Sequence, residues 1–95
     1  MRTYEVMTIH RPELAEDEVR NRVDDLATFL SDRGGNVTNK DFWGKRRFAY
    51  EIKHLHEGYY SVVTFTAEPP AVADLDRMLF LADEVVRHKI VRPEE

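Results

Sequence analysis

The residues best suited to chemistry form one block of cations and aromatic residues, Trp43-Gly44-Lys45-Arg46-Arg47-Phe48-Ala49-Tyr50. Guanidinium groups form bidentate hydrogen bonds with phosphates and stack on bases, and aromatic rings stack on exposed nucleotides. The block therefore predicts contact with folded or single-stranded RNA. We expect Phe48 and Tyr50 to anchor a hairpin in the core, and the cations at the Gly44 bend to face the RNA. The alternative is that these cations only form a solubilising rim.

A second group of cations lies near the end of the chain. Arg87 and Lys89 would share one face of a strand, opposite His88, and Arg92 follows shortly after. They could line an edge that faces phosphate, as could Arg2 at the start of the chain. Charges on a strand also protect a sheet edge against aggregation, and this alternative stays open.

The histidines, His10, His54, His56 and His88, raise the question of a metal or acid–base site. His54 and His56 could chelate an ion from one strand face, but the spacing specifies no third ligand. No nucleophile or carboxylate pair accompanies them in a catalytic motif, and the chain has no cysteine. We expect turn histidines, with no catalytic residue, no metal, no cofactor and no small-molecule substrate.

Composition limits the class of protein. A chain of 95 residues predicts one domain spanning residues 1–95. The formal net charge of −4 has the wrong sign for a protein that coats nucleic acid indiscriminately, so any RNA binding must be local. No targeting segment is evident, and no apolar run approaches the roughly 18–20 residues of a membrane span. These features favour a cytoplasmic protein without a membrane partner.

Hydrophobic periodicity predicts the elements that must position these residues. The first half of the chain is predicted to form a strand over 2–10, a helix over 16–31 and an extended stretch over 36–54 that bends at Gly44. A turn over 55–58 and a strand over 59–67 follow. A second helix begins at Pro69-Pro70 and carries Val72, Leu75, Leu79 and Ala82 on one face, and a last strand covers 85–91. The order predicts an α+β, ferredoxin-like βαββαβ fold, in which two helices cover one face of a four-stranded antiparallel sheet.

The uncovered face of this sheet is the expected site of function. If Tyr4 and Val6 face the helices, then Met7 and Ile9 face away, and Tyr60, Val62 and Thr64 of the third strand join them. An exposed apolar face usually marks a partner site, so we predict a protein interface at Met7, Ile9, Trp43, Tyr60 and Val62. The alternative is that the inward and outward faces are inverted.

At this point the pattern resembles the family of ribosomal protein six of the bacterial small subunit. The matching features run almost end to end: Met1-Arg2-x-Tyr4-Glu5-Val6, Gly34-Gly35, the block from Trp43 to Ile52, Gly58-Tyr59-Tyr60 and Leu75-Asp76-Arg77.

The resemblance implies a non-enzymatic protein that binds the central domain of small-subunit ribosomal RNA together with ribosomal protein eighteen. It implies RNA contact through Arg2, Lys45, Arg46 and Arg47, and, by a weaker match, through Arg87, Lys89 and Arg92. Thr8 and Ser61 depart from the family pattern, because they are polar where it commonly reads apolar. The acidic tail Glu94-Glu95 is short where some members carry a longer extension.

Three other classes of protein fit the same topology. A canonical RNA-recognition domain carries its stacking aromatics on the first and third strands, whereas the aromatic–basic block here is on the second. A ferredoxin-like isomerase or monooxygenase would use His10 or His88 on the open sheet. A regulatory ligand-binding domain would need a site that the sequence does not indicate.

Overall fold

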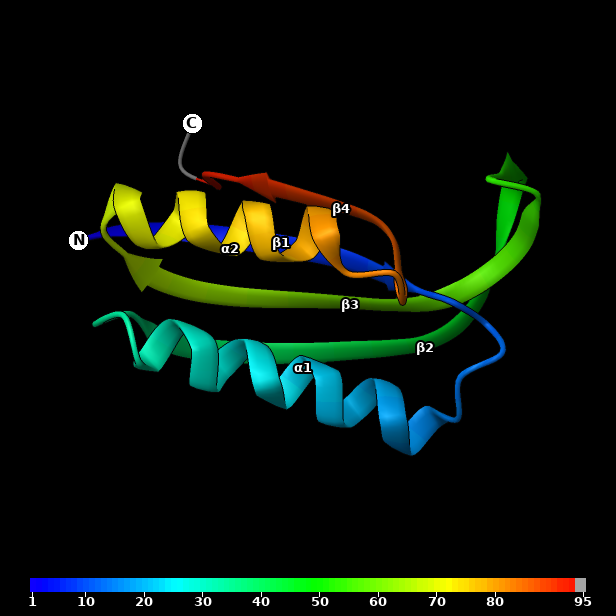
Figure 1. Cartoon of the computed structure of the whole chain (residues 1–95), viewed down its shortest axis with the longest axis horizontal. Helices are drawn as coiled ribbons and strands as arrows, with labels where there is room; N and C mark the ends of the chain where they lie inside the picture. The colour runs from blue at the N-terminus through cyan, green and yellow to red at the C-terminus, as the bar shows by residue number, and fades with distance from the viewer. Residues whose placement is uncertain (94–95) are drawn as a thin grey trace.

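The computed structural model describes residues 1–93 as two helices packed on one face of a sheet (Figure 1). The elements in chain order are β1 (Arg2–His10), α1 (Glu16–Ser31), β2 (Asn36–Ile52), β3 (Leu55–Ala67), α2 (Pro69–Leu81) and β4 (Val85–Val91). The strands lie in the order β2-β3-β1-β4, and every neighbouring pair is antiparallel. α1 lies along β2, and α2 lies over β1 and β4. The predicted ferredoxin-like fold is confirmed.

Each helix begins at residues that compensate for the unpaired backbone N–H groups of a first turn. The Glu18 carboxylate accepts a hydrogen bond of 3.1 Å from the Ala15 backbone N–H, and the acidic first turn of α1 complements the helix dipole. α2 begins at Pro69, where a missing N–H costs nothing. The predicted helix over 16–31 is confirmed. On α2 the buried residues are Ala71, Leu75 and Leu79, while the predicted Val72 and Ala82 are half-buried at the flank.

The core lies between the helices and the face of the sheet that carries Tyr4 and Val6, as predicted. The Tyr4 and Phe65 rings stack with their centroids 5.6 Å apart. Thr8 and Ser61, opposite each other on β1 and β3, are both fully buried, and their hydroxyl oxygens lie 2.6 Å apart. The two polar residues therefore satisfy each other, which is why the core tolerates them where apolar residues are expected.

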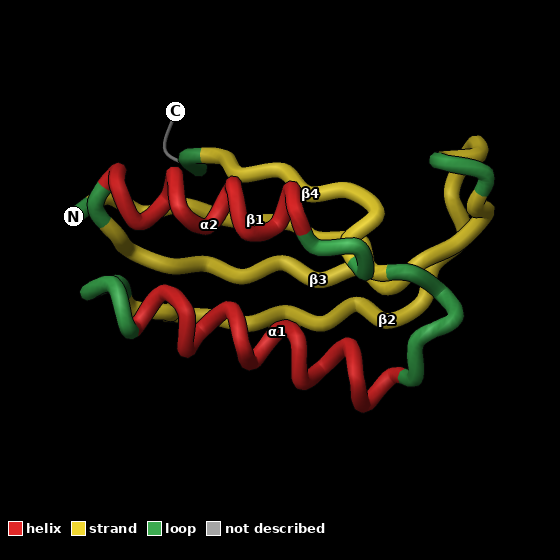
Figure 2. Tube along the Cα trace, in the orientation of Figure 1, coloured by secondary structure: helices red, strands yellow, loops and turns green. Residues whose placement is uncertain are grey.

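The two strands of the β2–β3 hairpin are longer than β1 and β4. The tip of this hairpin lies beyond the end of the helices (Figure 2). The turn was predicted over 55–58, and this was wrong. The chain reverses at Lys53 and His54, whose φ angles are 50° and 65°, so that Ile52 pairs with Leu55. Two successive positive φ angles make a turn that glycine and asparagine prefer and that these two residues occupy under strain.

Relieving this strain should stabilise the protein. The double change Lys53→Asn and His54→Gly is expected to raise the free energy of unfolding by about 1 kcal/mol, measured by urea denaturation. The matched control is Lys53→Ala with His54→Ala, which removes the same side chains without relieving the backbone. Equal stability of the two double variants would contradict a strained turn.

Candidate RNA- and partner-binding surface

The face of the sheet that points away from the helices, here called the open face, carries apolar residues of the two central strands. Met7, Tyr60 and Val62 are half-buried there, as the alternation of the strands predicted. Ile9 also lies on this face, but it is only 2% exposed, because the hairpin packs over it. Its predicted place on the open face is therefore correct, whereas its surface is not free for a partner.

The end of the hairpin folds over the open face and forms a groove with β1 and β4. The Phe48 ring meets the Tyr60 ring edge-on, with their centroids 6.0 Å apart. The groove, of about 430 Å³, is lined by Met7, Ile9, Phe48, Ala49, Tyr50, Ile52, Tyr60, Arg87 and Lys89. We name it the open-face groove. Its floor is apolar and its β4 rim is cationic, so it suits a ligand with both apolar and anionic groups.

The expectation that Phe48 and Tyr50 anchor the hairpin in the core was wrong. Tyr50 is 75% exposed, and Phe48 packs on the open face instead of in the helix-side core. The physical reason is the irregular register of β2, which shifts after Val37, after Phe42 and after Arg47. Each extra residue reverses the side-chain alternation and increases the local twist.

The hairpin cations, Lys45, Arg46 and Arg47, follow Gly44, whose φ of 87° makes the bend. They are exposed but do not point the same way. The Lys45 ammonium lies 5.1 Å from the centre of the Tyr59 ring, toward the helix side, while Arg46 lies by the open face. The expected single rim is therefore divided between two faces of the hairpin.

Trp43 and Tyr60 form a stacked pair on the open face, with their ring centroids 6.2 Å apart and their planes 9° apart. The indole N–H of Trp43 donates a hydrogen bond of 2.9 Å to the Asp41 carboxylate. The Arg46 Nε–H donates to the Trp43 carbonyl oxygen at 3.3 Å. These three side chains, Trp43, Arg46 and Tyr60, line one shallow surface depression, here called the stacking hollow. The structure thus joins Arg46, predicted for RNA, to two residues predicted for a protein partner.

The remaining predicted cations lie apart from the hairpin. Arg87 and Lys89 are exposed on the open-face side of β4, opposite His88, as predicted. Arg2 is exposed at the start of β1, which is the end of that strand remote from the hairpin, because the hairpin end of β3 pairs with His10. Arg92 is half-buried beside Tyr4, between α2 and β4. The acidic tail Glu94-Glu95 lies outside the described residues.

Asp41 and Phe48 were missed as parts of the site, although two signals could have found them. Asp41 is two residues before Trp43, and positions two apart on a strand share a face. Phe48 follows the Gly44 bend, where an inserted residue reverses the alternation that placed it in the core.

The histidines do not lie where an enzyme of this topology would need them. His10 and His88 are both on the helix side of the sheet, not on the open face. His88 Nε2 lies 2.8 Å from an Asp76 carboxylate oxygen and links β4 to α2. His54 and His56 lie by the turn, at 3.2 and 3.8 Å from Glu51 carboxylate oxygens. Within residues 1–93, no group of three or more potential ligands is arranged to hold a metal ion.

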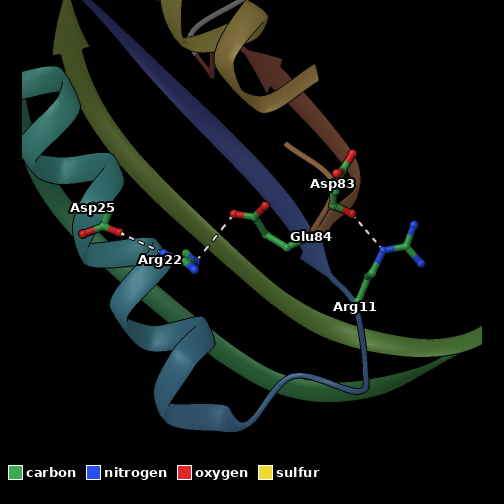
Figure 3. Close-up of polar contacts among 5 residues, drawn as sticks. All are labelled: Arg11, Arg22, Asp25, Asp83 and Glu84. Atoms are coloured by element: carbon green, nitrogen blue, oxygen red, sulfur yellow. Dashed lines mark hydrogen bonds and ion pairs between the residues drawn. The ribbon is translucent and has the colours of Figure 1, made fainter. Parts of the chain in front are cut away.

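A network of charged residues links α1 to the segment before β4 (Figure 3). Buried His10 lines a cavity with Arg22, Asp25 and Glu84 of this network. Guanidinium nitrogens of Arg22, in α1, lie 3.7 Å from an Asp25 carboxylate oxygen and 3.6 Å from a Glu84 carboxylate oxygen. The Arg11 Nε–H donates a hydrogen bond of 2.8 Å to the Asp83 carbonyl oxygen. Burial lowers the pKa of His10 below 6.5; Glu84 opposes this shift and Arg22 adds to it. His10 is therefore a buried histidine whose neutral form is favoured.

The buried His10 should make the protein less stable in mild acid. Because its folded pKa is lowered, the unfolded chain takes up a proton first; stability is full above about pH 6.5 and is lost as pH falls from there through the folded pKa. We expect His10→Gln to lose less unfolding free energy than the parent between about pH 7.5 and pH 5.5, measured by urea denaturation. Identical pH profiles for the parent and the variant would contradict the role of His10.

Neither of the two helices in residues 1–93 has the length and apolar character of a membrane-spanning segment.

Comparisons with known proteins agree over the whole fold. The family model described as ribosomal protein S6 matches residues 3–92. Small ribosomal subunit protein bS6 of Symbiobacterium thermophilum is 50% identical over 95 residues, which cover 100% of both chains. The bS6 protein of Arthrobacter sp. strain FB24 is 45% identical and matches over 94% of its length. The crystal structure of 30S ribosomal protein S6 from Thermotoga maritima superposes with a TM-score of 0.90 at 32% identity, covering 96% of this chain and 86% of that one.

These similarities extend across both helices, all four strands and the hairpin block. Small-subunit ribosomal proteins are cytoplasmic components of the ribosome, and the family is one of structural proteins, not a class of enzymes. The chain therefore belongs to the ribosomal protein S6 family of the small ribosomal subunit.

Proposed function

We propose that this protein binds the central domain of small-subunit ribosomal RNA together with ribosomal protein eighteen. The hairpin cations and the exposed cations Arg2, Arg87 and Lys89 contact RNA phosphates, and Arg92 contributes from the end of β4. The apolar open face receives the partner protein at Met7, Tyr60 and Val62, with Ile9 beneath and Trp43 at its border. Residues 1–95 act as one domain.

The observation that carries this proposal is the distribution of ion pairs. On the helix side, most arginine and lysine residues pair with carboxylates, as in Arg33–Asp74 at 3.2 Å and Lys40–Asp24 at 2.8 Å, and Arg77 of α2 is an exception. Within the described part of the chain, the ion pairs include none of Arg2, Lys45, Arg46, Arg47, Arg87 and Lys89. Unpaired cations remain available to release counterions from RNA, whereas paired ones are already compensated.

The net charge of −4 is consistent with this arrangement. Exposed carboxylates lie on the helices, for example Glu16, Asp17 and Glu18 in the first turn of α1. An acidic helix side repels phosphate while the open face and the hairpin attract it, so the charge distribution orients the protein on RNA. The resulting binding is local, as the composition predicted.

Binding to a labelled central-domain RNA fragment tests the proposal. Affinity should be higher with ribosomal protein eighteen than without it, and should fall steeply between about 50 and 200 mM salt, because phosphate contacts release counterions. A fragment from another domain of the same RNA is the control. Binding that depends on neither salt nor the partner, or equal binding of both fragments, would contradict the proposed function.

A further inference from the structure

The stacking hollow has features of a ligand site that the general proposal does not use. Trp43 is the only tryptophan of the chain and is 47% exposed, although it stacks on Tyr60. The hollow is bounded by two aromatic rings in nearly parallel planes and by the guanidinium group of Arg46. Flat aromatic surfaces bind other flat groups by stacking, and a guanidinium group binds phosphate.

Hydrogen bonds within the chain hold the hollow in place before any ligand binds. The indole of Trp43 is fixed by its N–H donation to Asp41, and the Arg46 side chain by its donation to the Trp43 carbonyl oxygen. The Arg46 contact uses Nε, so the two terminal nitrogens of the guanidinium are not involved in it. Side chains that are already ordered lose little conformational entropy on binding.

A nucleotide suits this hollow better than a protein side chain does. The aliphatic residues Met7, Ile9 and Ile52 line the open-face groove and not the stacking hollow. The hollow therefore offers π surface and positive charge without an aliphatic pocket for an apolar anchor. Lys45 and Arg47, on either side of Arg46 in sequence, supply further charge for the adjoining phosphates.

We propose that the exposed face of the Trp43 ring, whose other face stacks on Tyr60, stacks on one unpaired nucleobase of RNA while Arg46 binds its phosphate. This inference rests on the proposed function, because it names the contact by which the hairpin holds single-stranded RNA. It moves Trp43 from the border of the protein interface to the RNA site. The partner protein then occupies the open face on the Met7 side of Tyr60.

A pair of RNA hexamers tests the proposal at fixed low salt: one made of six adenosines, and one with the same backbone but no bases. Labelled RNA reports affinity by fluorescence anisotropy. The base-free hexamer should bind about 5- to 150-fold more weakly, as expected for the loss of one stacked base. Because the chain has one tryptophan, the adenosine hexamer should quench its emission and the base-free hexamer should not.

Substitutions of Trp43 test whether its ring causes the difference in affinity between the two hexamers. Trp43→Ala should lower the affinity for the adenosine hexamer to that for the base-free one, and should leave the latter unchanged. Trp43→Phe keeps a stacking ring and should retain most of the difference, which separates lost stacking from lost folding. The matched control is Phe80→Ala, at an aromatic residue of α2 that is 79% exposed, and it should have no effect.

The possible failures are distinguishable. Equal binding of both hexamers would overturn the stacked base and leave the proposed phosphate contacts intact. No binding of either hexamer would contradict the RNA contact of the hairpin, and the stacked base with it. Quenching of Trp43 by ribosomal protein eighteen but not by adenosine RNA would assign the ring to the protein interface and overturn the inference.

Discussion

Replacing Lys45, Arg46 and Arg47 together with alanine should weaken binding to the central-domain RNA on the order of 100-fold at low salt, and should make it less dependent on salt. All three side chains are exposed, and in the described chain none forms an ion pair with a carboxylate. A charge-assisted contact is worth about 1.5 kcal/mol or somewhat less when exposed. Loss of three phosphate contacts should reduce the slope of log K against log salt by about 2 to 3.

The control for this prediction removes the same charge from the helix side. Arg33, Lys40 and Arg77 can be replaced together with alanine, so that both triple variants lose three positive charges. Arg33 and Lys40 already pair with Asp74 and Asp24, and Arg77 is exposed on α2. A filter-binding series across salt should show a changed slope for the hairpin variant only. Equal effects would mean that net charge, not the hairpin, determines binding.

The helices and the first and last strands could be predicted from local pattern, because burial imposes that pattern directly. Val19, Val23, Leu26 and Leu30 repeat at helical spacing and are all buried in α1. The bounds of β1 and β4 also follow their predicted ranges. Each of these elements packs one stripe or face against a single core, so periodicity along the chain is enough.

The long hairpin could not be predicted in the same way, because its geometry depends on irregular backbone. Gly58 suggested a turn, but the turn is at Lys53 and His54, which carry no sequence signal for positive φ. The shifts of register in β2 then place Phe48 on the open face and leave Tyr50 exposed. Period-two reasoning fails after each shift, since every following side chain changes face.

The candidate site was predicted as a set of residues but not as an arrangement. Arg46 and Trp43 come from one sequence block, whereas Tyr60 comes from β3, and only pairing of the strands brings the three together. Which cations are paired with carboxylates is likewise a long-range property; Lys40 and Asp24, for example, are 16 residues apart. Such contacts have no local signature, so the sequence alone left the basic block between two interpretations.

Gly58 does not form the predicted turn; it lies within β3 and packs closely against β1. Its substitution is expected to have the largest effect on stability. Gly58 is buried in β3, opposite Arg46. A Cβ atom added there would lie 2.7 Å from the Ile9 side chain and 2.9 Å from the His10 carbonyl oxygen. Both distances are well below ordinary contact distances of about 3.5–4.0 Å, and the carbonyl belongs to a paired central strand that cannot easily move.

Gly58→Val should therefore lower the free energy of unfolding by about 3 kcal/mol, measured by urea denaturation. The valine side chain would also push the hairpin away from the open-face groove, because its Cβ would lie 3.1 Å from the Phe48 ring. Binding of ribosomal protein eighteen should fall with it. Ala73→Val adds a branched side chain at an exposed position of α2, away from the open-face groove, and should leave partner binding unchanged and cost less than about 1 kcal/mol of unfolding free energy. If Gly58→Val kept the stability of the parent, the close packing of the hairpin on β1 would be wrong.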